Sequence, residues 1–156
     1  MNKLRKNNQA GFTLIEMLVT VLILGVLAAA GGAVYLGYVK DAKTAEAKAV
    51  IGSVWTALQA CAQAVPGTAC LTAGQYGRAG LTAAGATADT RWTITGGTLT
   101  MAAATGILTL AAPIVATAEA GAADITGIVV TFNYITTGNP PGTFTCLLPP
   151  SAATPC

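Results

Sequence analysis

Apolar residues form one long run near the start of the chain. After a polar opening, the stretch from Phe12 to Val39 is apolar or small, with a few hydroxyl groups and a single carboxylate, Glu16. Residues 17–39 carry no charge. As a helix that stretch would be about 35 Å long, enough to cross a bilayer core of about 30 Å. The pattern predicts a membrane-embedded helix over residues 12–39.

The apolar pattern changes to a one-sided helical repeat over residues 40–65. Apolar residues recur there every three or four positions, which makes one face of a helix, at Val50, Val54, Leu58, Cys61 and Val65. Lys43, Glu46 and Ser53 fall off that face. Pro66-Gly67 should end the helix. We therefore expect an amphipathic second half of the same helix, packed on the rest of the chain.

Residues 66–156 should form a globular head. Residues 66–90 are rich in Gly, Ala and Thr and are predicted to be a loop. In the segment RWTITGGTLTM, Gly96-Gly97 resembles a two-residue hairpin turn. Such a turn would place Ile94 opposite Leu99 and Trp92 opposite Met101, with apolar side chains on one face.

Further strands are predicted over residues 107–110, 125–135 and 143–148, where β-forming residues gather. The sequence Asn139-Pro140-Pro141-Gly142 should form the turn before the last strand. The predicted fold class is α+β: a long N-terminal helix packed on a small antiparallel sheet of about four strands within residues 91–148.

Charge is scarce and unevenly placed, which limits both topology and chemistry. Only 9% of residues are charged, and Lys3, Arg5 and Lys6 precede the apolar run. This bias predicts that the N-terminus stays in the cytoplasm. The head has no basic patch for nucleic acid and the chain has no His. We expect no enzyme activity, no catalytic residues, no cofactor and no metal.

Glu16 needs a cationic partner that its own neighbourhood does not supply. A carboxylate in a membrane helix costs about 2.5–3.5 kcal/mol on insertion scales. Cleavage after Gly11 would give Phe12 a positively charged α-amine. Because that amine lies about 6 Å from Glu16 along its own helix, it pairs more readily with Glu16 of a shifted neighbouring copy. The pair would set the stagger between copies.

Two ordinary interpretations compete with this one. A secretory signal peptide would be cut near Ala28-Ala29-Ala30, and a plain signal anchor would keep the apolar run in the membrane. Both leave Glu16 unexplained. The N-terminal residue of the mature protein separates the secretory interpretation from cleavage after Gly11.

Gly11-Phe12-Thr13-Leu14-Ile15-Glu16, between a basic leader and a long apolar helix, resembles the prepilin cleavage motif of type IV pilins and type II secretion pseudopilins. The resemblance implies that a prepilin peptidase removes residues 1–11, cutting between Gly11 and Phe12, and methylates the Phe12 amine. It also implies that Phe12 and Glu16 dock each subunit onto a growing filament, and that the head adopts the pilin-like roll.

The same resemblance implies function, partners and location. The chain would be a structural pilin, a homo-oligomer in a helical filament, assembled by a pilus platform with its ATPase. The precursor would cross the inner membrane once, surrounded by lipid, before joining an extracellular surface filament. The alternatives are a pseudopilin of a type II secretion system and a secreted binding module cut near Ala30.

Cys61, Cys70, Cys146 and Cys156 all follow the predicted membrane helix, on its oxidising side. An even number of cysteines there favours two disulfides, with three possible connectivities. Sequence proximity favours Cys61–Cys70 and Cys146–Cys156, and type IV pilins often have a C-terminal disulfide loop like residues 146–156. Neither gap has C-x-x-C spacing, which argues against a zinc site or a redox-active pair.

Overall fold

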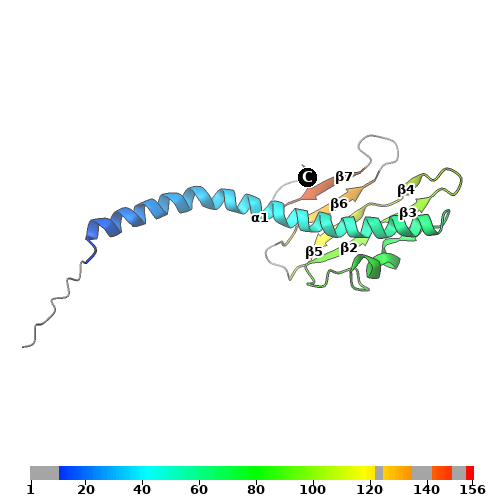
Figure 1. Cartoon of the computed structure of the whole chain (residues 1–156), viewed down its shortest axis with the longest axis horizontal. Coiled ribbons are helices and arrows are strands. Elements are labelled where there is room, and N and C mark those ends of the chain that lie inside the picture. The colour runs from blue at the N-terminus through cyan, green and yellow to red at the C-terminus, as the bar shows by residue number, and fades with distance from the viewer. Residues whose placement is uncertain (1–10, 122–124, 135–141, 149–153) are drawn as a thin grey trace, which may run out of the picture. The chain divides into compact units, whose positions relative to one another are not determined.

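A computed structural model describes residues 11–121, 125–134, 142–148 and 154–156. These residues form an α-helix, a 3-10 helix and eight strands (Figure 1). In chain order they are α1 (Leu14–Ala64), β1 (Cys70–Leu71), η1 (Thr72–Ala79), β2 (Trp92–Gly96), β3 (Thr98–Met101), β4 (Leu108–Leu110), β5 (Ile114–Ala118), β6 (Val129–Asn133), β7 (Thr143–Leu147) and β8 (Thr154–Pro155). The fold class is α+β, with a long N-terminal helix and antiparallel sheets, as predicted.

The chain divides between Val39 and Lys40 into two compact units, so α1 contributes to both. In the first unit the large apolar side chains from Phe12 to Leu27 are all exposed. The helix is long and apolar enough to cross a membrane, judged by length and composition alone.

In the second unit α1 buries one face against the sheets. Its fully buried apolar residues are Ala47, Ile51, Val54, Leu58 and Ala62. The predicted face was right at Val54 and Leu58 and wrong at Val65, whose side chain is exposed. The observed face is rotated towards Ala47, Ile51 and Ala62, which the predicted set did not include.

The strands form two antiparallel sheets rather than the single sheet of about four strands that was predicted. One sheet has the order β2-β5-β6-β7-β8 and the other β1-β3-β4. The core between the larger sheet and α1 contains buried side chains from four of its strands, Trp92, Ile94, Ile114, Ala116, Val130, Phe132 and Cys146. Figure 1 shows α1 running along these strands.

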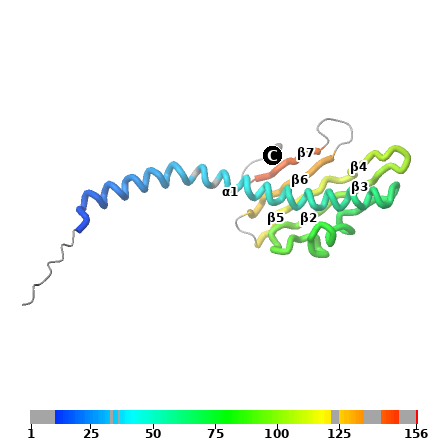
Figure 2. The backbone as a smooth tube through the Cα atoms, viewed as in Figure 1, coloured from blue at the N-terminus to red at the C-terminus, as the bar shows by residue number. Residues whose placement is uncertain are grey.

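The predicted hairpin at Gly96-Gly97 is wrong, because β2 and β3 belong to different sheets. Strand β2 pairs with β5, in the register Gly96↔Ile114, while β3 pairs with β4, in the register Leu99↔Leu110. Residues 92–101 and 108–118 therefore make one long antiparallel ribbon, which can be followed in Figure 2. Its end lies at residues 102–107, where Ala102 N–H donates to the Ile107 carbonyl.

A β-bulge explains why the ribbon passes from one sheet to the other at Gly97. Between the two registers, Gly97 stands opposite both Ala112 and Pro113, and its N–H donates to the Pro113 carbonyl at 3.0 Å. An extra residue on one strand bends the ribbon and strengthens its twist. Gly97 also has a positive φ of 76°, and a Cβ there would lie 2.2 Å from Thr72 Oγ1.

The remaining predictions for the head have mixed outcomes. The predicted loop 66–90 contains β1 and η1, and β5 was not foreseen. Strands β4, β6 and β7 lie within predicted strand segments. Residues 1–10 of the leader, Ile135, residues 139–141 of the predicted turn and residues 149–153 of the C-terminal loop lie outside the described ranges.

Candidate functional site at the start of the helix

The first turn of α1 is held by a reciprocal pair of side chains, Thr13 and Glu16. Thr13 precedes the first helical residue, and its N–H and hydroxyl donate to Glu16 Oε2 at 2.8 and 3.0 Å. Glu16 N–H donates back to Thr13 Oγ1 at 3.3 Å. This is a capping box, which satisfies backbone donors that a helix start leaves unpaired.

The capping box gives Glu16 a structural role that was not predicted from the sequence. The signal was present, because Thr-x-x-Glu before an apolar run is the capping-box pattern. The carboxylate is also stabilised by the positive end of the helix dipole. Glu16 is thus positioned at the N-terminal end of α1 while remaining exposed to a partner.

Gly11 and Phe12 lie in backbone without regular secondary structure, just before the cap. The Phe12 side chain is 80% exposed, and a Cβ built on Gly11 would have no atom within 4 Å. The fold of the chain therefore does not itself require glycine at position 11. Any demand for a small residue there must come from a protein that handles this segment.

The head is tied together by two disulfides. Cys61 of α1 is bonded to Cys70 of β1, and Cys146 of β7 is bonded to Cys156. These are the local pairs favoured by sequence proximity. The first bond fixes the end of α1 to the smaller sheet, and the second fixes the C-terminal residue to the larger sheet.

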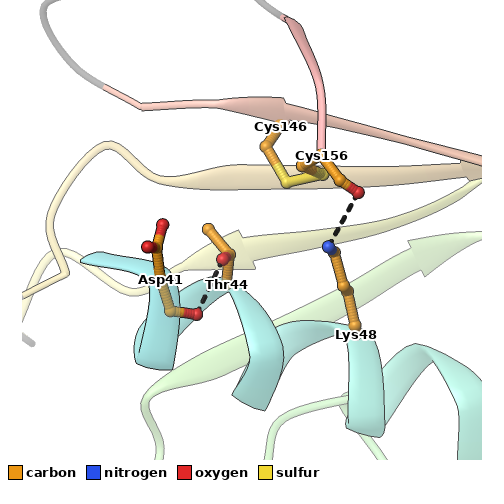
Figure 3. The surroundings of a disulfide bond; sticks show 5 residues. All are labelled: Asp41, Thr44, Lys48, Cys146 and Cys156. Carbon is orange, nitrogen blue, oxygen red and sulfur yellow. Dashed lines mark hydrogen bonds between the residues drawn. A yellow bond between two sulfur atoms is a disulfide. The ribbon is translucent and has the colours of Figure 1, made fainter. Parts of the chain in front are cut away.

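A lysine that the sequence analysis did not single out joins the second disulfide to the helix. Figure 3 shows Lys48 of α1 reaching Cys156, where its Nζ donates to the backbone oxygen at 2.9 Å. Lys48 Nζ also lies 5.8 Å from the centroid of the Phe144 ring. Cys156 N–H donates to the Phe144 carbonyl at 3.3 Å. These contacts fasten residue 156 between α1 and β7.

Glu46 makes another polar link between α1 and the larger sheet. Its Oε1 accepts a hydrogen bond from the indole of Trp92 at 3.1 Å and lies 3.6 Å from Arg91 Nε. Glu46 was predicted to fall off the packed face, and its side chain is 35% exposed. The carboxylate sits at the margin of that face because the buried indole N–H needs an acceptor.

The described residues give little support for a metal site or for acid–base chemistry. Within those ranges no three His, Cys, Asp or Glu side chains gather closely enough to hold a metal ion. Asp89 is exposed, and its pKa is lowered mainly by the hydrogen bond from the Thr87 hydroxyl. That interaction organises the turn before β2.

Comparison with known proteins locates one recognised motif. A family model described as the prokaryotic N-terminal methylation motif matches residues 6–32. No curated protein and no solved structure matches the chain. The matched segment contains the capping box and the exposed apolar part of α1 described above. Residues 6–32 thus give this chain the signature of type IV pilins and their prepilin precursors.

Proposed function

We propose that this chain is a structural subunit of a type IV pilus, which polymerises into a filament on the cell surface. The observation that carries the proposal is the coincidence of the methylation motif with an exposed apolar helix bearing one carboxylate at its start. An apolar surface of that length must be covered by lipid or by other copies. A helical filament covers it with other copies.

In this proposal a prepilin peptidase cuts between Gly11 and Phe12 and methylates the new Phe12 amine. The exposed, non-helical backbone at the cut supports this step. Glu16 then accepts the charged Phe12 amine of a neighbouring subunit in the low-dielectric bundle. Its capped position supports that role, because side chains on a helix tilt towards the N-terminus, the end from which the amine projects.

The proposal assigns a task to each part of the chain. Residues 1–11 are a leader, residues 12–39 cross the inner membrane once and later form the filament core, and residues 40–65 carry the head, residues 66–156. The N-terminus faces the cytoplasm before processing. The pilus platform and its ATPase move subunits from the lipid into the extracellular filament.

A type II secretion pseudopilin is the second candidate, because the methylation motif supports both classes. The Cys146–Cys156 disulfide supports the pilus, since it fastens Cys156 onto a head that would be exposed outside the cell. A pseudopilin would be required for protein secretion and would leave no surface filaments.

The test is the composition of filaments sheared from cells that express the chain. We expect the chain to be a component, with mass spectrometry placing its first residue at N-methylated Phe12. A mature terminus at Gly31 would contradict the proposal and favour the secretory interpretation. A methylated Phe12 terminus found only in membranes, together with loss of secretion on deletion, would favour the pseudopilin.

A further inference from the structure

Two tyrosines lie together on α1, in the last turns before Lys40. Tyr35 and Tyr38 are 67% and 70% exposed, and because they are three residues apart they lie on the same side of the helix. Residues 13–34 contain no aromatic residue. The aromatic side chains of this helical segment are therefore confined to one level, close to the end that the charge bias places outside the cytoplasm.

The hydroxyl groups of these two tyrosines need a polar partner. Among the described residues, neither hydroxyl makes a hydrogen bond within the chain, whereas the Tyr76 hydroxyl in the head donates to the Ile94 carbonyl at 2.8 Å. A tyrosine side chain favours the boundary between hydrocarbon and water, where the ring contacts apolar groups and the hydroxyl contacts polar ones. Tyr35 and Tyr38 therefore have the chemistry of residues that bind the headgroup layer of a bilayer.

The distance from the tyrosines to Glu16 matches the thickness of a bilayer core. Glu16 and Tyr35 both belong to α1, and the rise between them is about 29 Å, against a hydrocarbon core of about 30 Å. Residues 17–34, which lie between them, carry no charge. When Tyr35 lies at the outer boundary of the core, Glu16 lies at the inner boundary. Lys40, the first charged residue after the apolar run, then reaches the outer headgroup layer.

Length alone does not set this depth. Residues 12–39 would extend about 42 Å as a helix, which exceeds the core by about 12 Å. If Phe12 lay at the inner boundary instead, Glu16 would lie about 6 Å inside the hydrocarbon, where an acidic side chain is costly. The tyrosines and the carboxylate thus favour the same depth from opposite ends of the span.

We propose that Tyr35 and Tyr38 anchor the precursor in the outer headgroup layer and thereby hold Glu16 at the inner boundary of the hydrocarbon core. The partner of this surface is the lipid bilayer. This proposal rests on the proposed function, because it requires residues 12–39 to cross the membrane once. At this depth Gly11 and Phe12 lie on the aqueous side of the inner boundary.

Cysteine labelling of the uncut, full-length precursor measures the depth. Inside-out membrane vesicles from cells that lack prepilin peptidase expose the cytoplasmic side to an impermeant maleimide. The variants Leu14→Cys, Leu18→Cys and Leu24→Cys are made one at a time, and none of the described native cysteines is free to react. Position 14 lies about 3 Å outside the level of Glu16, and positions 18 and 24 lie about 3 Å and about 12 Å inside it. We expect labelling at positions 18 and 24 to be at least about tenfold slower than at position 14, because the reactive thiolate forms in water.

Removal of the tyrosines should move the helix along the membrane normal. Leucine favours hydrocarbon, so Tyr35→Leu with Tyr38→Leu should draw this end inwards by about 5 Å, one helical turn, and push Leu18 past the inner boundary. Labelling of Leu18→Cys should then accelerate at least about fivefold, while that of Leu24→Cys stays slow. Tyr35→Trp with Tyr38→Trp is the matched control. It should keep the wild-type rates, because tryptophan also favours the headgroup layer.

Three results would overturn the proposal. The first is an unchanged rate for Leu18→Cys in the leucine pair. The second is the same acceleration in the tryptophan pair, since a residue suited to the headgroup layer would then fail to hold the helix. The third is equal acceleration at positions 18 and 24 in the leucine pair, because the helix would then be leaving the membrane rather than shifting by one turn.

Alkaline extraction of the same membranes separates a failure of the depth anchor from a failure of the proposed function. Wild-type precursor released by alkali would contradict the membrane crossing on which the proposed function depends. Precursor that resists alkali, but shows the same labelling rates with and without the tyrosines, would contradict only the depth anchor. Thermal unfolding in detergent should be the same for both double variants, because the side chains of Tyr35 and Tyr38 are exposed.

Discussion

At the scale of single residues, the start of α1 combines two demands on one carboxylate. Glu16 completes a capping box with Thr13 in the isolated chain, and in our proposal it also receives the Phe12 amine of another subunit. These roles are compatible, because Glu16 Oε2 accepts both bonds from Thr13 and leaves Oε1 to accept another. They differ in what they need: a cap needs an acceptor, whereas an ion pair needs a negative charge.

Gly11→Val tests whether position 11 is read by a peptidase. We expect an uncut precursor that accumulates in the membrane, because the chain itself has room for a side chain there. Immunoblots of membrane fractions would show the longer chain. Gly11→Ala is the matched control and should be cut more efficiently than Gly11→Val. If Gly11→Val were cleaved as efficiently as wild type, the prediction would be contradicted, because the peptidase would then accept a large side chain at position 11.

At the scale of elements, sequence patterns identified features that depend on neighbours along the chain. The long helix followed from apolar periodicity, and Val54 and Leu58 were placed correctly because large side chains mark a buried face. A buried alanine cannot be told from an exposed one by its residue type, so Ala47 and Ala62 were missed. Ile51 was also missed, because its neighbour Val50 fits the helical spacing equally well. Gly96-Gly97 misled because two positive φ values suit either a type I′ turn or a bulge, and only the distant partner β5 decides.

The residues of the candidate site also fall into two groups: those that a local motif identifies and those that only contacts between distant residues identify. Gly11, Phe12 and Glu16 form a contiguous motif, so they were visible in the sequence, and the Thr13 cap was visible but not recognised. The contact of Lys48 with Cys156 joins residues 108 positions apart. The ring contact of Trp55 with Phe132 likewise needs α1 and β6 to meet, which no local pattern specifies.

A pair of glycine substitutions tests the bulge. Gly97→Ala should destabilise the head by about 1–2 kcal/mol more than Gly106→Ala, because both residues have positive φ but only Gly97 is packed against Thr72 and Ile114. Denaturant unfolding of the full-length variants in detergent measures the difference. Equal losses would contradict the close packing at Gly97.

At the scale of the whole molecule, the two disulfides fix different ends of the head. Replacing Cys146 and Cys156 together by serine should lower the free energy of unfolding by about 2–3 kcal/mol, on the chain-entropy estimate for such short loops. Replacing Cys61 and Cys70 should cost a similar amount. Denaturant unfolding under non-reducing conditions measures both, and an unchanged midpoint would contradict the estimate.

In our proposal, lipid covers the exposed apolar part of α1 first and other copies cover it later. That assignment joins the methylation motif, the membrane-length helix and the head into one assembly unit. Its central claim is that the charge of Glu16, rather than its cap, drives the addition of each subunit.

Glu16→Gln tests that claim most directly, because glutamine completes a capping box but carries no charge. Thr13→Ala is its counterpart, since it removes the hydroxyl and keeps the carboxylate. The measurement is the ratio of cleaved protein in sheared filaments to cleaved protein in membranes. We predict that Glu16→Gln is cleaved but almost absent from filaments, because a buried amine without its partner costs about 3–5 kcal/mol, while Thr13→Ala still assembles. A wild-type ratio for Glu16→Gln would contradict the account.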